Sequence, residues 1–68
     1  MMNIGSILKY YRMRNNLTQA ELCKGVCSIS HLSKIESNKY IPHNETINEL
    51  FKRMGIEWER EVDIYEGW

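Results

Sequence analysis

The side chains in this chain that most readily perform covalent or metal chemistry are its two cysteines and two histidines. Cys23 and Cys27 lie four residues apart, a spacing that suits one helix face or a helix and its following turn. A zinc site would need His31 and a fourth ligand, and none stands at a recognised spacing. His31 has no adjacent nucleophile, and there is no glycine-rich phosphate loop or carboxylate pair. We therefore expect no metal, no cofactor and no enzyme, and interpret the cysteines as small buried thiols.

Side chains that form hydrogen bonds gather instead between residues 28 and 40. Ser, Asn, Lys and Tyr side chains commonly contact the phosphates of DNA, and such contacts fix the position of a protein on the duplex. At neutral pH a histidine there would act mostly as an uncharged donor. The candidate phosphate contacts in this stretch are Ser28, His31, Asn38, Lys39 and Tyr40.

The formal net charge is zero, but the charges are divided unevenly along the chain. Residues 1–56 contain eight Lys and Arg against four Glu, whereas residues 57–68 contain five acids and one Arg. This division favours a polyanion-binding body with an acidic end, although many domains show a similar imbalance by chance.

The length of 68 residues suits one domain. No apolar run approaches the roughly 18 residues that cross a bilayer, and the first residues lack the features of a signal peptide. We expect a cytoplasmic protein without membrane contact.

Apolar spacing predicts a helix over residues 4–14, ended by Asn15-Asn16, because Asn tolerates the left-handed conformation. Thr18 and Glu21 form a Thr-x-x-Glu capping box that opens a short helix over residues 19–25. Its inward residues are Leu22, Cys23 and Val26.

Ser28 is expected to cap a third helix over residues 29–36, followed by a loop over residues 37–43. Asn44 is expected to cap a fourth helix over residues 45–54, which Gly55 ends. The fold class is therefore all-α, a compact bundle of four or five short helices. Its expected core fillers include Met13, Phe51 and Met54.

Residues 17–36 combine a capped short helix, a tight break and a second capped short helix. That arrangement is typical of a helix-turn-helix, which holds its second helix free to enter a DNA major groove about 12 Å wide. Leu32 and Ile35 fix the buried side of this helix. The opposite side, expected to lie toward the groove and contact bases, consists of Ile29, Ser30, Ser33 and Lys34.

The same stretch contains L-T-Q-x-E-L, then a break, then S-x-x-x-L-S-K-I-E. This resembles the Cro/cI-type (XRE) helix-turn-helix family, whose fold is lambda-repressor-like, and the resemblance covers residues 4–56. It implies a domain that binds double-stranded operator DNA sequence-specifically in a bacterial or phage transcriptional regulator, for example a repressor. Family members usually act as homodimers on inverted repeats.

The resemblance also implies roles for single residues. Gln19 matches a residue that contacts a phosphate and supports the recognition helix. Ile29, Ser30 and Lys34 match positions that contact bases, where Lys34 can donate to guanine, Ser30 can serve several base edges and Ile29 can pack on a thymine methyl. Arg12 and Glu36 stand where the family holds a structural ion pair between the first and third helices.

One departure concerns the turn, which is one residue shorter than in the common family pattern and has Val26-Cys27-Ser28. This turn is similar to that of the DNA-binding domains of PlcR/NprR-type regulators, quorum-sensing proteins with a C-terminal tetratricopeptide array. The similarity implies that the chain is a fragment, and that a peptide effector would act only through a missing C-terminal domain.

Residues 57–68 form an acidic segment with Trp58, Val62 and Tyr65 at helical spacing. We divide the chain into a DNA-binding domain, residues 1–56, and this amphipathic segment, a dimer contact or a linker to a further domain. The alternative function is a protein-interaction module on the same fold, such as an antitoxin or an adaptor, which the acidic aromatic segment slightly favours.

Overall fold

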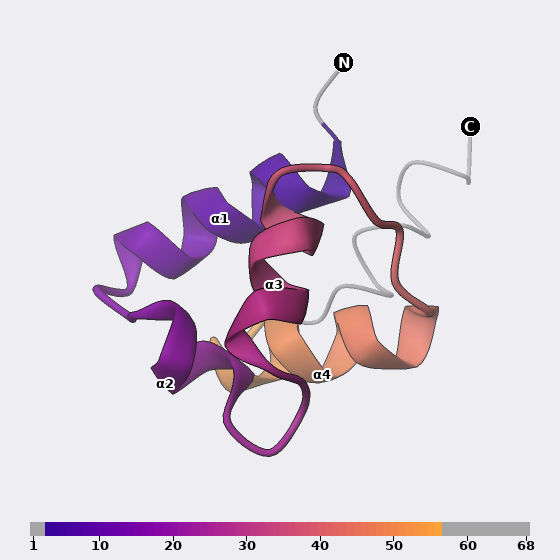
Figure 1. Ribbon diagram of the computed structural model, residues 1–68. Helices are drawn as coiled ribbons and strands as arrows, with labels where there is room; N and C mark the ends of the chain where they lie inside the picture. The colour runs from indigo at the N-terminus through magenta and orange to yellow at the C-terminus, as the bar shows by residue number, and fades with distance from the viewer. Residues whose placement is uncertain (1–2, 57–68) are drawn as a thin grey trace, which may run out of the picture.

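A computed structural model describes residues 3–56 as four α-helices. They are α1 (Ile4–Arg14), α2 (Gln19–Cys23), α3 (Ile29–Glu36) and α4 (Asn44–Arg53). In Figure 1, α3 crosses the middle of the view, with α1 and α2 at the left and α4 at lower right. Contacts join α3 to α1 and to α2, and α2 also packs against α4. The fold of residues 3–56 is thus all-α, with helices and connecting turns but no strand, as predicted, and the segment 57–68 lies outside the described residues.

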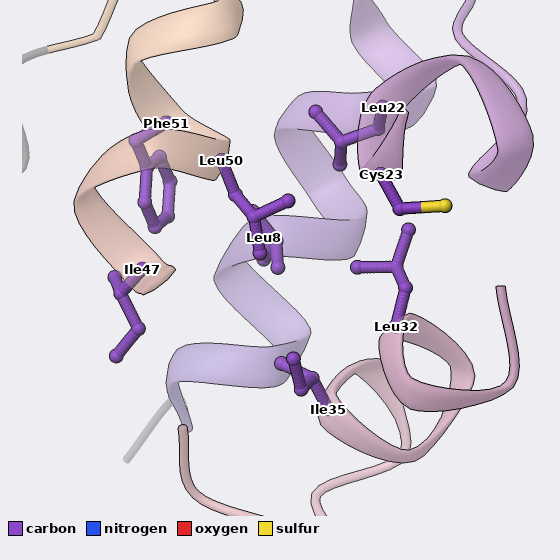
Figure 2. Packing of buried hydrophobic residues seen from close by; sticks show 8 residues of the cluster. All are labelled: Leu8, Leu22, Cys23, Leu32, Ile35, Ile47, Leu50 and Phe51. Atoms are coloured by element: carbon purple, nitrogen blue, oxygen red, sulfur yellow. The ribbon is translucent and has the colours of Figure 1, made fainter. Parts of the chain in front are cut away.

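One hydrophobic core joins all four helices (Figure 2). Leu8 of α1, Leu32 of α3 and Leu50 of α4 have no exposed surface. Fully burying such a side chain is worth about 1.5–3 kcal/mol, so the inward side of each helix is firmly set. The buried core consists of Leu8, Leu22, Cys23, Leu32, Ile35, Ile47, Leu50 and Phe51.

The predicted core fillers divide between the inside and the outside of the fold. Phe51 is fully buried and Met54 packs against the core as a partly buried side chain, so both predictions are confirmed. The prediction for Met13 is wrong, because its side chain is 60% exposed. Met13 follows buried Leu8 by five residues, and five residues turn a helix by roughly 140°, away from the core.

Two helix starts are capped as predicted. Thr18 Oγ1 accepts the Glu21 N–H at 3.0 Å, and Glu21 Oε1 accepts the Thr18 N–H at 2.9 Å. Hydrogen bonding of the Glu21 carboxylate to Thr18, through the Thr18 backbone first and its side chain second, lowers the pKa of Glu21 from its ordinary value. This box therefore contributes stability at neutral pH and loses it as the pH falls through that lowered pKa. At α3, Ser28 Oγ accepts the His31 N–H at 3.0 Å.

Three predicted boundaries are wrong, and one of them is the end of α4, which lies at Arg53 rather than at residue 54. The helix α2 ends at Cys23 rather than residue 25, because Lys24 has an extended ψ of 121° and Gly25 a φ of 80°. Asn44 does not cap α4: it is the first helical residue, and His43 occupies the cap position without a side-chain hydrogen bond. The predicted ends at Asn16 and Gly55 agree with their positive φ values of 55° and 74°.

The first turn of α1 lies directly against the last turn of α3. A Cβ placed on Gly5 would lie 1.9 Å from the carbonyl oxygen of Ile35, so only glycine permits this approach. Beside it, Asn38 Nδ2 donates to Ser6 Oγ at 3.1 Å. The two helices are thereby joined at one end.

At the other end of α1, Arg12 forms a two-pronged ion pair with Glu36. Arg12 Nε lies 2.6 Å from Glu36 Oε2, and Arg12 Nη2 donates to Glu36 Oε1 at 3.1 Å. Their side chains are 13% and 3% exposed. Gln19 Nε2 also donates to Glu36 Oε1 at 3.1 Å, while Arg12 Nη1 donates to the Leu17 carbonyl at 2.8 Å. The network ties α1, the α1–α2 connection, α2 and α3 together.

Removing one member of the Arg12–Glu36 pair should destabilise the domain strongly. We expect Arg12→Met to lower the free energy of unfolding by about 3–5 kcal/mol, because Glu36 remains buried without its partner. The double variant Arg12→Met/Glu36→Met should recover much of that loss. Urea unfolding of the two single variants and the double variant measures the coupling.

The matched control is Arg14→Met, which removes an exposed cation from the same helix together with its exposed contact to Tyr10, and should change stability by no more than about 1 kcal/mol. Additive effects of the Arg12 and Glu36 changes would show that their contact contributes nothing to stability.

Candidate nucleic-acid interface

One side of α3 is left to solvent. Ile29, Ser30, Ser33 and Lys34 are all exposed, and Ile29 is 51% exposed although it is apolar. On the other side Leu32, Ile35 and Glu36 are buried. With 100° between successive residues, the four exposed residues span an arc of roughly 140°. The structure thus brings all four predicted base-contacting residues onto one outward strip, which we term the α3 outer face.

The start of this face is fixed by the α3 cap. Ser28 is exposed, and its hydroxyl oxygen accepts the His31 N–H. A serine hydroxyl still has its own O–H to donate while its oxygen accepts. Ser28 is therefore able to cap α3 and to donate outward from the same position.

His31 and Tyr40 form one border of the α3 outer face. Their rings make an edge contact with centroids 4.7 Å apart and planes inclined at 62°, and Tyr40 is 39% exposed. Lys39, beside Tyr40, is exposed, and its backbone N–H donates to the Lys34 carbonyl at 2.9 Å. The chain after α3 is thus held close to the end of the helix. This places the Lys39 ammonium and the Tyr40 phenol beside the α3 outer face.

Gln19 and Asn38, two further candidate phosphate contacts, have internal partners. Gln19 donates to Glu36, and Asn38 donates to Ser6. A side-chain amide has two N–H donors, so each retains one for another acceptor. Gln19 stands at the first position of α2, and Asn38 adopts a left-handed φ of 62° just after α3.

The charges around the α3 outer face favour a polyanion. Within α3 the cation is Lys34, and the acid is Glu36, which is buried and paired with Arg12. The other acids of the described chain are Glu21, in the α2 capping box, and Glu45 and Glu49 on α4. The face itself therefore presents Lys34 and small hydroxyls, which can donate to phosphates and to base edges.

The described residues 3–56 contain no group of three or more potential metal ligands. None of the helices over this range is long and apolar enough to cross a membrane.

Two contacts that support the interface were not expected from the sequence. Asn38 and Ser6 are 32 residues apart, and Arg53 Nη1 of α4 donates to the Lys24 carbonyl in the α2–α3 turn, 29 residues away. A polar residue whose partner lies about thirty residues away shows no local sequence pattern that identifies the partner. For Asn38 the sequence offers only the tendency of Asn to adopt a left-handed backbone conformation, which does not predict the hydrogen bond to Ser6.

Comparison with known proteins agrees with this geometry. Comparisons with curated proteins and with solved structures found no match. A family model described as Helix-turn-helix matches residues 8–60, more than three quarters of the chain. The match contains α2, the turn and α3 in full. The chain therefore belongs to the Cro/cI-type (XRE) helix-turn-helix family, a DNA-binding family whose members are usually not enzymes.

Proposed function

We propose that this chain binds double-stranded DNA sequence-specifically as the operator-binding domain of a bacterial or phage transcriptional regulator. The observation that supports this most directly is the α3 outer face. Four residues are exposed side by side, while the other side of the helix is fully engaged in the core and the ion pair. A major groove about 12 Å wide admits an α-helix presented in this way.

Within this proposal the residues divide into two groups. Ile29, Ser30, Ser33 and Lys34 contact bases, and the surrounding residues contact phosphates. Lys34 is the best candidate for a specific contact, because a lysine can donate to both O6 and N7 of guanine. The proposed phosphate contacts, which fix position rather than sequence, are Gln19, Ser28, His31, Asn38, Lys39 and Tyr40.

Binding should weaken steeply as salt is added. Each phosphate neutralised by a Lys or Arg releases counterions, so the logarithm of the association constant should fall with a slope of about −0.9 per neutralised phosphate. Fluorescence anisotropy with a duplex selected from random DNA, titrated between dilute and physiological salt, measures the slope. An association that is neither weakened by salt nor selective for sequence would count against DNA as the partner and favour the alternative, a protein-interaction module.

Base contacts and phosphate contacts should respond differently to substitution. Lys34→Ala should lower discrimination at particular base pairs by about 1–3 kcal/mol. Lys39→Ala, the matched loss of one exposed lysine, should weaken all sequences about equally and make the salt slope shallower by about one. Affinities for a panel of single-base-pair operator variants separate the two patterns. If both substitutions gave one and the same specificity profile, α3 would not present its outer face to the bases.

The proposal extends to a cytoplasmic homodimer on an inverted repeat. One domain with a small basic excess would bind weakly alone, and two half-sites would supply the missing affinity. The short turn at residues 26–28 supports a place among PlcR/NprR-type quorum-sensing regulators. On that placement a peptide effector acts through a further C-terminal domain. Residues 57–68, with their apolar spacing, serve as the dimer contact or as the link to that domain.

Removing residues 57–68 tests this division of the chain. The four helices of residues 3–56 should keep their helicity and their unfolding transition, because among these described residues the buried core lies between Leu8 and Phe51. Self-association and bivalent operator binding should be lost. Circular dichroism and analytical ultracentrifugation before and after truncation provide the measurements. If the shortened chain unfolded, residues 57–68 would be part of the core. If the full chain and the shortened chain were both monomeric, these residues would not be the dimer contact.

A further inference from the structure

The turn between α2 and α3 is joined to α4 by one side chain. Arg53 is the last residue of α4, and its Nη1 donates to the carbonyl oxygen of Lys24, the first residue after α2. The two residues are 29 positions apart in the chain. Figure 1 shows the orange end of α4 beside α2, and the two helices are in contact. A side chain of α4 therefore holds the segment that leads into α3.

The carbonyl that Arg53 holds belongs to the peptide at the centre of the turn. Lys24 has φ −56° and ψ 121°, and Gly25 has φ 80°, which match a type II turn. The Val26 N–H closes it by donating to the Cys23 carbonyl at 2.9 Å. A type I turn keeps this closing bond with its central peptide rotated, and glycine tolerates both forms. Because rotation would direct the Lys24 carbonyl elsewhere, the bond from Arg53 favours the type II form.

The two ends of α3 are not held equally. At its last residue, the buried Glu36 carboxylate accepts hydrogen bonds from Arg12 and Gln19. This network fixes the end of α3 against α1 and α2. The start of α3 depends instead on the Ser28 cap and on the turn before it. A change in the turn would therefore act mostly on the first residues of the helix.

The α3 outer face includes residues at both ends of the helix. Ile29 and Ser30 are the first two residues of α3 and follow the turn closely, whereas Lys34 stands in the last turn, near Glu36. All three of these outward residues are exposed. A loosened turn would thus displace Ile29 and Ser30 and leave Lys34 in place.

We propose that Arg53 is a positioning residue for base recognition. By holding the Lys24 carbonyl, it sets the direction in which the start of α3 presents Ile29 and Ser30 to DNA. The inference rests on the DNA binding proposed above. An arginine suits this role, because its planar guanidinium stays charged and a hydrogen bond from a charged donor is stronger than a neutral one.

Arg53 is also an exposed cation, so the competing role is a direct phosphate contact. The two roles predict different results. A lost phosphate contact weakens binding to all sequences about equally and makes the salt slope shallower by about one. A lost positioning contact changes discrimination at particular base pairs, because the cation itself does not meet DNA.

The experiment measures the affinity of full-length Arg53→Gln for the panel of single-base-pair operator variants. Discrimination should fall roughly fivefold or more at the base pairs that also respond to Ile29→Ala or Ser30→Ala, the lower end of the loss for a broken base contact. At the base pairs that respond to Lys34→Ala it should stay within about twofold, as for distant, independent sites.

Two further variants serve as controls. Lys52→Gln removes the neighbouring exposed cation of α4 and should leave the specificity profile unchanged. Gly25→Ala weakens the turn from within, because alanine disfavours a positive φ, while its Cβ would meet nothing within 4 Å. Without any change of charge, Gly25→Ala should reproduce the profile of Arg53→Gln. Circular dichroism should show all three variants folded, since the three residues are exposed.

Two outcomes would overturn the proposal. In the first, Arg53→Gln weakens every duplex equally and makes the salt slope shallower, as expected of Lys39→Ala, so that Arg53 is a phosphate contact. In the second, the profile of Arg53→Gln equals that of the unchanged protein, so that the bond to the turn has no effect on base recognition. Either result leaves the proposed DNA binding intact.

A measurement without DNA separates this inference from the proposed function. If the chain selects no DNA sequence, the proposed function is wrong, and nuclear magnetic resonance of the free protein then decides the role of Arg53. In Arg53→Gln, the amide signals of Ile29 and Ser30 should shift and the Val26 amide should exchange faster with solvent. Lys52→Gln should change neither. Unchanged signals in Arg53→Gln would show that Arg53 does not position the start of α3.

Discussion

The buried carboxylate of Glu36 is the group on which the arrangement of the helices depends. Its side chain is 3% exposed, and a charge at that depth is tolerated only with good partners. Arg12 brings α1 to it and Gln19 brings α2, while Arg12 also holds the Leu17 carbonyl between them. Because Glu36 is the last residue of α3, satisfying this one charge fixes the end of α3 against α1 and α2.

The remaining constraints on α3 act on its other parts. Leu32 and Ile35 set its rotation by burial, and the Ser28 hydroxyl sets its start. Gly5 allows α1 to approach its last turn. None of these constraints involves Ile29, an apolar residue in the first turn of α3 that is half exposed. An apolar side chain held outward on a rigid helix suits a partner surface that the free domain already fits.

Local signals predicted much of this fold. The capping residues Thr18 and Ser28 and the apolar spacing placed α1 and α3 correctly, since these effects act within a few residues. Met13 was misplaced although its spacing from Leu8 already turns it away from the core. Asn44 was misplaced because the exact cap position depends on dihedral angles that neighbouring residue types do not determine. The Arg12–Glu36 pair was expected through family resemblance alone, and the bond from Arg53 to Lys24 was not expected at all. Contacts between residues so far apart follow from packing, which has no local signature.

The α2–α3 turn is closed by its own backbone. Lys24 and Gly25 reverse the chain with dihedral angles that glycine adopts without strain, and the Cys23 carbonyl accepts two backbone N–H groups across the turn. These backbone bonds close the turn, and α2 packs directly on α3. Val26 and Cys27, in the second half of the turn, pack against the hydrophobic core as partly buried side chains. The position of α3 against α2 therefore rests on the backbone contacts of the turn, on this packing, and on Arg53 of α4, whose side chain donates to the Lys24 carbonyl.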